Sequence, residues 1–231
     1  MWHPGTLGEM HPKLAPLSRR AAVGVATAAP ALAVSTTGPS SATFAADKGN
    51  PVLTANGQTL VCSSSSVGGP VNASGNPVAT INSASWGGCN WGAYGATVTV
   101  NAAAAAWSLN VTSGATSALG DHSIVGNLTG ISNVLVDING PFGHCTFNVS
   151  GSVDGTFDEW VDKNGNGIMD VGDAQQLNVT NSHLTVSNVN STLRCAGLIS
   201  NGDAATFTGT YNYYPQTAPN ANPSGWINIL P

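Results

Sequence analysis

Several segments of the chain alternate apolar and polar residues with a period of two. In WSLNV (107–111), Trp107, Leu109 and Val111 share one side, and two polar residues share the other. The segments VLVDI (134–138), CTFNVS (145–150) and ATFTGTYNYY (205–214) follow the same pattern. A β-strand with one buried face alternates in this way, because successive side chains point to opposite faces of the sheet. The pattern therefore predicts many half-buried strands.

Turn-forming residues separate these runs. They occur in SGNP (74–77), GGCNWG (87–92), NGPFGH (139–144) and SNGD (200–203). Short strands spaced by such turns are typical of an all-β protein, so we expect an antiparallel β-sandwich or a partly closed β-barrel. The only helix-like stretch, NAAAAAW (101–107), lies between alternating segments and is predicted to be a strand connection with one helical turn.

The size and composition favour one folded domain. The chain has 231 residues, of which 42% are hydrophobic and 7% are charged. This length is sufficient to bury a core. We expect a single domain over 47–231, with an irregular Pro- and Asn-rich tail at 215–231. No stretch after residue 46 approaches the roughly 18 apolar residues of a membrane-spanning helix.

The N-terminal segment has the features of an export signal. Arg19 and Arg20 precede a mildly apolar run at 21–34, and small residues follow. Candidate cleavage points lie after Ala33, Ala42, Ala45 and Ala46, and the start is either Met1 or Met10. We assign 1–46 to an export signal and leader, by the ordinary secretory or the twin-arginine route, and expect a secreted, extracellular or cell-surface protein. The alternative is a disordered Ala-rich tail.

The charge of the exported part excludes some partners. From Asp47 onward there are three basic and ten acidic residues, a formal net charge of −7. Without a basic patch, the chain is not expected to bind nucleic acid or an anionic membrane surface. Six of the ten acids lie within 154–173, so the charge is concentrated in one region. They are Asp154, Asp158, Glu159, Asp162, Asp170 and Asp173.

Four cysteines occur, at Cys62, Cys89, Cys145 and Cys195. An even number in an exported chain predicts two disulfides. Of the three connectivities, Cys62–Cys89 with Cys145–Cys195 is favoured, because sequential strands usually neighbour each other. A zinc site is the alternative, but no C-x-x-C pair is present.

Residues 162–173, DKNGNGIMDVGD, match a twelve-position calcium loop. Gly167 falls at position 6, where the loop turns sharply. The expected oxygen ligands are at positions 1, 3, 5, 7, 9 and 12, and position 7 contributes its backbone carbonyl. They are Asp162, Asn164, Asn166, Ile168, Asp170 and Asp173.

The loop departs from the usual pattern in two respects. Position 12 is Asp173 in place of the longer glutamate, and the flanking segments are predicted to be strands, not helices. We expect Ca²⁺ binding on the order of 10⁻⁴–10⁻³ M that stabilises the tip of a β-hairpin over about 154–180. The alternative is a metal-free Asn-Gly turn. Asp158 and Glu159 are expected to be surface charges and not further ligands.

Several motifs together resemble a group of small secreted all-β proteins of actinobacteria. They are QTLVCSSSS (58–66), INSASWGGC (81–89), AAWSLNV (105–111), HCTFNVSGSVDGTF (144–157) and LRCAGLISNGDAATFTGTYNYYP (193–215). The last is the most specific, with its C-x-G-L-I-x-x-G-D-A-A-T-F-x-G-T-Y pattern. The resemblance implies export, two disulfides and an all-β fold, and it implies no activity. The calcium loop is an insertion relative to that group.

The chain lacks recognisable catalytic motifs. There is no G-x-S-x-G and no H-E-x-x-H, and Asp121, His122 and Ser123 are adjacent in sequence, which rarely forms a triad. We expect no enzyme and no catalytic residues, but a structural or interaction role. The alternative is a calcium-dependent carbohydrate- or envelope-binding module that uses exposed tryptophans. Its candidates are Trp86, Trp91, Trp107, Trp160 and Trp226, with core packing favoured for the first three.

Overall fold

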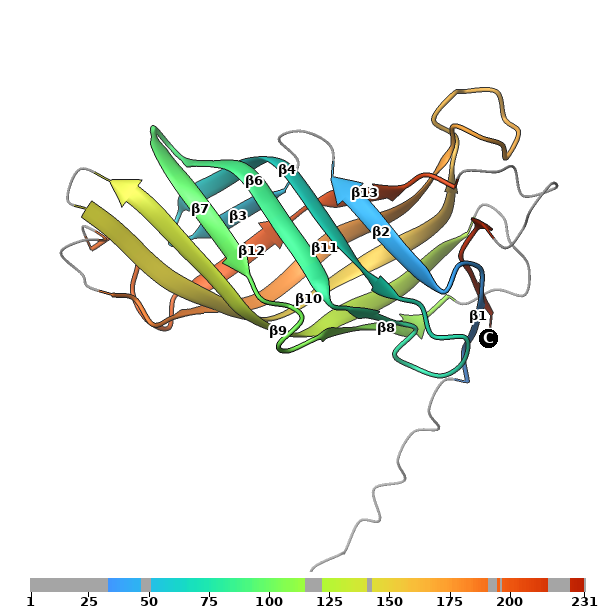
Figure 1. Cartoon of the computed structure of the whole chain (residues 1–231), viewed down its shortest axis with the longest axis horizontal. Helices are drawn as coiled ribbons and strands as arrows, with labels where there is room; N and C mark the ends of the chain where they lie inside the picture. Colours follow the sequence, from blue (N-terminus) through green and yellow to red (C-terminus); the bar gives the residue numbers. More distant parts are fainter. Residues whose placement is uncertain are drawn as a thin grey trace, which may run out of the picture. The chain divides into compact units, whose positions relative to one another are not determined.

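The computed structural model describes residues 33–46, 51–114, 122–140, 143–190, 195, 197–215 and 225–230, which form strands and turns without an α-helix. All of them belong to one compact unit, Leu32–Pro231. In that part of the chain no helix is long and apolar enough to cross a membrane. The strands (Figure 1) are β1 Ser35–Thr37, β2 Ser41–Ala46, β3 Val52–Ala55, β4 Gln58–Pro70, β5 Ala79–Ile81, β6 Ser83–Trp91, β7 Tyr94–Val100, β8 Trp107–Ser113, β9 Ser123–Gly140, β10 Gly143–Val161, β11 Ala174–Ser187, β12 Ala204–Thr208, β13 Thr210–Tyr213 and β14 Asn228–Leu230.

Strands β2 to β13 form one twelve-stranded antiparallel sheet that is ring-like but not closed. Each strand of the ring pairs with the next, from β9 through β10, β11, β12, β3, β4, β6 and β7 and back to β9, but one of these pairings covers only part of its strand. The ring is incomplete beside β6, because β7 pairs only with its last residues, Cys89–Trp91. The free edge of Ser83–Gly88 pairs with no other described strand. The prediction of an all-β, partly closed antiparallel architecture is confirmed.

The core lies inside this ring and follows the predicted alternation. In β10, Cys145, Phe147 and Val149 are buried and the residues between them are partly exposed. Phe147 lies opposite Val136 of β9, and both are fully buried. The Trp91 ring packs edge-on against Phe147, with centroids 5.9 Å apart. Such edge-to-face packing contributes about 0.5–1.5 kcal/mol beyond the burial of area.

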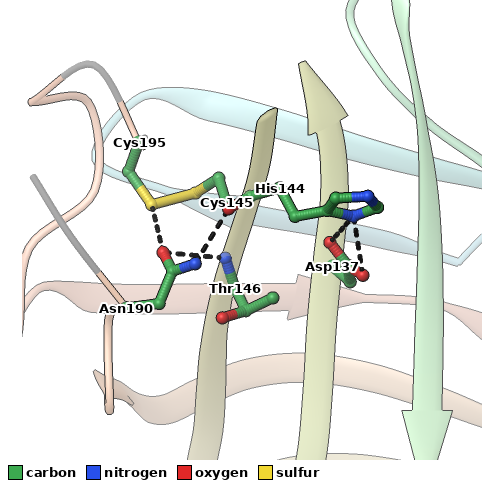
Figure 2. A network of polar contacts seen from close by, with 6 residues as sticks. All are labelled: Asp137, His144, Cys145, Thr146, Asn190 and Cys195. Atoms are coloured by element: carbon green, nitrogen blue, oxygen red, sulfur yellow. Dashed lines mark hydrogen bonds and ion pairs between the residues drawn. A yellow bond between two sulfur atoms is a disulfide. The ribbon is translucent and has the colours of Figure 1, made fainter. Parts of the chain in front are cut away.

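Both disulfides have the predicted connectivity. Cys62 of β4 and Cys89 of β6 are direct cross-strand partners. Cys145 of β10 is bonded to Cys195, which is not part of a strand. Figure 2 shows how Asn190 holds this part of the chain beside the disulfide: its Nδ2 donates to the His144 carbonyl at 2.8 Å, and its Oδ1 accepts from the Thr146 N–H at 3.2 Å.

The folded unit begins earlier than the predicted boundary at residue 46. β2 pairs with β4 and β13, and its Phe44 is buried against Phe157. Of the candidate cleavage points, only the one after Ala33 leaves both β1 and β2 in place. The export signal itself, including Arg19, lies outside the described residues.

The C-terminal tail was predicted to be irregular over 215–231. Its described end differs from this prediction, because it contains a strand and is buried. β14 pairs with β1, and Trp226 and Ile229 are buried. The fully buried Gln175 donates to the Ile227 carbonyl at 2.6 Å and accepts from the Ile227 N–H at 2.8 Å. Residues 216–224 lie outside the described part. The Pro- and Asn-rich sequence of the tail did not predict these two hydrogen bonds.

Candidate calcium site

The loop 162–173 lies at the tip of the hairpin formed by β10 and β11. Val161 and Ala174, the residues on either side of it, are paired in the ladder. The loop therefore leaves and re-enters a regular antiparallel sheet. No helix flanks it, in agreement with the strand-like sequence around it.

The first half of the loop is coiled by its own side chains. Asp162 accepts two backbone hydrogen bonds, from Gly165 N–H at 2.6 Å and from Gly167 N–H at 2.8 Å. Asn164 Oδ1 accepts from the Asn166 N–H at 3.1 Å, and Asn166 Oδ1 accepts from the N–H of Ile168 at 2.7 Å. These are Asx-turns, which Asp and Asn favour.

Gly167 occupies the position where the loop turns. Its φ is +71°, in the left-handed region where residues with a Cβ are strained. No atom lies within 4 Å of the position a Cβ would take, so space is not the reason for glycine here. The requirement is conformational.

Three predicted ligands are in direct contact. Asn164 Nδ2 donates to Asp170 Oδ1 and Asn166 Nδ2 donates to Asp170 Oδ2, both at 2.8 Å. All three are exposed or partly exposed. Positions 3, 5 and 9 of the loop thus form one cluster of oxygen and amide groups. A cation bound by these oxygens would require the two amides to turn away from Asp170.

Asp173, at position 12, anchors the base of the loop. Its side chain is fully buried. Oδ1 accepts from the Lys163 N–H at 3.0 Å, and Oδ2 accepts from Trp160 Nε1 at 2.8 Å and from the Asp170 N–H at 3.1 Å. Burial raises the pKa of Asp173, but the Trp160 and backbone hydrogen bonds outweigh it and hold the pKa below its ordinary value.

The donor set fits Ca²⁺ in its chemistry. Calcium takes oxygen ligands, both from carboxylates and from amide or backbone carbonyls. Asp162 and Asp170 supply carboxylates, two asparagines supply amide oxygens, and the exposed Ile168 supplies only its backbone. In the described part of the chain, no group of three or more His, Cys, Asp or Glu side chains is arranged to hold a metal ion. Calcium binding therefore stays a prediction. It depends on the amide oxygens of Asn164 and Asn166 and on the Ile168 backbone carbonyl, in addition to the carboxylates.

The neighbouring acids are not simply surface charges. Asp158 is partly buried and accepts from Asn178 Nδ2 at 2.8 Å. Glu159 is fully buried, and its Oε1 accepts from the Ile229 N–H at 2.9 Å. The prediction of a surface position is wrong for Glu159. Its side chain joins the hairpin to the C-terminal strand, which arrives from a distant part of the sequence.

The tryptophans do not form an exposed platform. Trp91, Trp107 and Trp226 are buried, and Trp86 is only partly exposed. Trp160 is partly buried and its indole nitrogen is bonded to Asp173. Stacking of a sugar on an exposed indole face therefore has no support from the tryptophans that the structure describes.

Two of the described histidines are hydrogen-bonded to aspartates on the surface. His144 Nδ1 contacts Asp137 at 2.9 Å (Figure 2), and His183 Nε2 contacts Asp154 at 2.9 Å. All four side chains are at least one-third exposed. His183 Nε2 also lies 3.4 Å from Asn181 Nδ2. Asp121 lies outside the described residues.

Comparison with known proteins adds no assignment: the chain matches no protein-family model, no curated protein and no solved structure.

Proposed function

We propose that this is a secreted or cell-surface protein with a structural or interaction role, whose β10–β11 hairpin is stabilised by Ca²⁺ bound in the loop 162–173. Two disulfides in one compact unit suit an oxidising, extracellular environment. Calcium at millimolar concentration outside cells suits the weak affinity expected for a loop of this kind.

The observation that carries the proposal is the self-coiled loop. Asp162, Asn164 and Asn166 each accept backbone N–H groups of the loop, which leaves further lone pairs on these oxygens free for a cation. The backbone of the loop is therefore already coiled, and only the amides of Asn164 and Asn166 must turn away from Asp170 to admit the ion. A coiled backbone loses less conformational entropy on binding than an open loop does.

The bound cation would supply positive charge to an acidic hairpin tip. Asp162 and Asp170 lie in the loop, with Asp173 at its base and Asp158 on the strand below. Lys163 is the only lysine or arginine between 154 and 190. Ca²⁺ would reduce the repulsion among these carboxylates and hold the two ends of the loop together.

Calorimetric titration of the full chain with Ca²⁺, together with melting curves in calcium and in chelator, tests the proposal. At Ca²⁺ tenfold above Kd, the free energy of unfolding should rise by about 1.4 kcal/mol. For a domain of this size, that is a rise in Tm of about 3–6 °C. Asp162→Ala should abolish both the binding heat and the rise in Tm.

Asp137→Ala is the matched control, because it removes an acid of the same sheet outside the loop. It should leave both calcium effects intact. Absence of binding heat at several millimolar Ca²⁺, with an unchanged melt, would show that the loop is a metal-free turn.

A further inference from the structure

Asparagine is followed directly by glycine at five places in the chain. These asparagines are Asn56, Asn139, Asn164, Asn166 and Asn201. Such a pair can lose the side-chain amide spontaneously, when the backbone nitrogen of the following residue attacks Cγ of the asparagine. Glycine favours this attack because it has no Cβ to hinder it and because its backbone adopts conformations that other residues avoid. Two of the five pairs lie in the loop 162–173.

The three pairs outside the loop are held mainly by main-chain groups. The N–H that follows Asn201 donates to the Val186 carbonyl at 2.9 Å. Asn139 lies within the β9–β10 ladder. The side-chain amide of Asn56 donates to the Leu198 carbonyl at 2.8 Å. Among the described residues, no carboxylate accepts the glycine N–H of these three pairs.

In the loop, one carboxylate accepts both glycine N–H groups. Asp162 Oδ1 accepts from Gly165 at 2.6 Å, and its Oδ2 accepts from Gly167 at 2.8 Å. These are the nitrogens that would attack Asn164 and Asn166, respectively. A carboxylate bonded to such an N–H is positioned to take the proton while the nitrogen attacks, as a general base does.

The side-chain carbonyls under attack accept hydrogen bonds from main-chain donors. Asn164 Oδ1 accepts from the Asn166 N–H at 3.1 Å, and Asn166 Oδ1 accepts from the Ile168 N–H at 2.7 Å. A donor on a carbonyl oxygen stabilises the negative charge that develops there during addition. Each of these bonds also closes an Asx-turn, which folds the side chain back toward the glycine peptide that follows it.

Both glycines have space and solvent around them. All four residues of the two pairs are exposed. No atom lies within 4 Å of the position that a Cβ would take at Gly165 or at Gly167. The cyclic imide that forms on attack, and the water that opens it, therefore meet no steric obstacle on that side.

We propose that Asn164 and Asn166 are sites of spontaneous deamidation, which Asp162 promotes. The glycine nitrogen forms a bond to Cγ, and its proton passes to the Asp162 carboxylate. Cleavage of the Cγ–Nδ2 bond then releases ammonia, which carries that proton away, and leaves a cyclic imide. Water opens either C–N bond of the imide and gives aspartate or isoaspartate. The sum is asparagine and water to acid and ammonia, so no other reactant is required.

The modification would change the candidate calcium site. Aspartate in place of Asn164 or Asn166 adds a carboxylate at position 3 or 5, where calcium loops take either residue. Isoaspartate instead lengthens the main chain of the loop. This consequence rests on the proposed function. The deamidation itself does not, because it requires no metal and is measured in chelator.

The test follows all five pairs in the full chain by mass spectrometry of its peptides, with fragmentation that separates the two loop sites. The protein is incubated in a mildly alkaline buffer with chelator, either folded or in guanidinium chloride. In the folded protein, Asn164 and Asn166 should convert faster than the other three. In guanidinium chloride this difference should be lost, because Asp162 no longer contacts the glycines.

Asp162→Asn keeps the shape of the side chain and removes the basic carboxylate. It should slow conversion at both loop sites by about tenfold, less than the 10²–10⁴-fold that a general base contributes in enzymes. Asp137→Asn is the matched control, since Asp137 contacts His144 on the sheet and not the loop. It should change neither rate.

Two results would overturn the proposal. Conversion of the loop pairs in the folded chain that is no faster than that of the other three would show that the loop does not promote the reaction. Unchanged or faster conversion in Asp162→Asn would show that the carboxylate shields the glycine N–H groups and does not activate them. The first result needs no variant, and neither depends on whether calcium binds.

Discussion

The indole nitrogen of Trp160 donates a 2.8 Å hydrogen bond to Oδ2 of Asp173, thirteen residues along the chain. This bond ties the end of the loop 162–173 to the strand that enters it. Asp173 is buried, so the bond to its carboxylate is shielded from water. Hydrogen bonds to charged groups contribute more than neutral ones, about 1.5–3 kcal/mol.

Trp160→Phe should therefore destabilise the protein by about 1.5–3 kcal/mol, because it removes the donor and keeps most of the aromatic ring. Urea unfolding at pH 7 in chelator measures the change. The control is the same substitution in an Asp173→Asn background, where the cost should be smaller. Equal costs in both backgrounds would mean that the ring packs and the hydrogen bond contributes nothing.

Acid should weaken the fold through Asp173. Its pKa in the folded chain is lowered below the ordinary value of 3.8. The ionised form is thus favoured by folding, and this contribution is complete above about pH 4 and is lost as pH falls through the lowered pKa. Unfolding free energies measured from pH 5 down to pH 2 should fall less steeply in Asp173→Asn. An identical slope in this variant would assign the acid sensitivity to other carboxylates.

Alkali should weaken the fold through Tyr211. Burial raises the pKa of its hydroxyl to about 12, against partial compensation by hydrogen bonds from Ser65 and Trp86. The neutral phenol is favoured in the folded state, so its contribution is complete below about pH 10 and is lost as pH rises toward 12. The loss should be about 2–3 kcal/mol.

Unfolding of Tyr211→Phe over the same pH range is the comparison. A shallower slope should remain, because the pKa of the partly buried Tyr213 is also raised. If the variant loses as much stability between pH 10 and 12 as the parent does, the Tyr211 hydroxyl is not the titrating group.

The disulfide Cys145–Cys195 should raise the free energy of unfolding of the whole domain and should also restrain the residues near the bridge. It closes a loop of 50 residues, for which chain entropy predicts about 4 kcal/mol, against about 3.5 kcal/mol for the 27 residues of Cys62–Cys89. The local effect should differ more. Cys62–Cys89 joins strands that are already paired, whereas Cys195 is not part of a strand.

Replacing both members of Cys145–Cys195 with alanine should accordingly increase hydrogen exchange at Val189 and Asn190 near the bridge. The double alanine variant of Cys62–Cys89 is the control and should leave exchange there unchanged. Equal protection in the two variants would show that the Asn190 hydrogen bonds are sufficient to hold the segment.

The N-terminal boundary is testable by truncation. A chain that starts at Val34 keeps β1 and β2, whereas one that starts at Asp47 loses both. The shorter chain exposes the edges of β4 and β13 that β2 covers, and it removes the buried Phe44. Loss of a buried phenylalanine alone costs about 3–5 kcal/mol. The chain from Val34 should melt cooperatively and the chain from Asp47 should not; equal melts would place β2 outside the stable unit.

The alternation of residues predicted which faces of the strands are buried, and the even cysteine count predicted two bridges. The alternation shows which face of a strand is buried, but it does not show which strand is its neighbour. The ring of pairings around β9 and β4 was therefore not predicted. The single predicted run 205–214 is divided at Gly209, where β12 ends and β13 moves to a different neighbour.

The candidate site was predictable only in its local part. The spacing of Asp162, Asn164 and Asn166 identified the loop, because Asx-turns depend on residues two to five positions apart. The burial of Glu159 was not evident, since it depends on Ile229, 70 residues away in sequence. A charged residue within an acidic run has the same local pattern whether a distant strand covers it or not.

The two ends of the folded unit are paired with each other, Ser35 with Leu230 and Thr37 with Asn228. During synthesis, β1 leaves the ribosome among the first strands and its partner β14 among the last. The two-stranded sheet therefore cannot form before 228–230 have been synthesised, and the bonds from Gln175 and Glu159 to 227–229 must wait as well. A chain that stops before Ile229 lacks the segment that covers its buried glutamate.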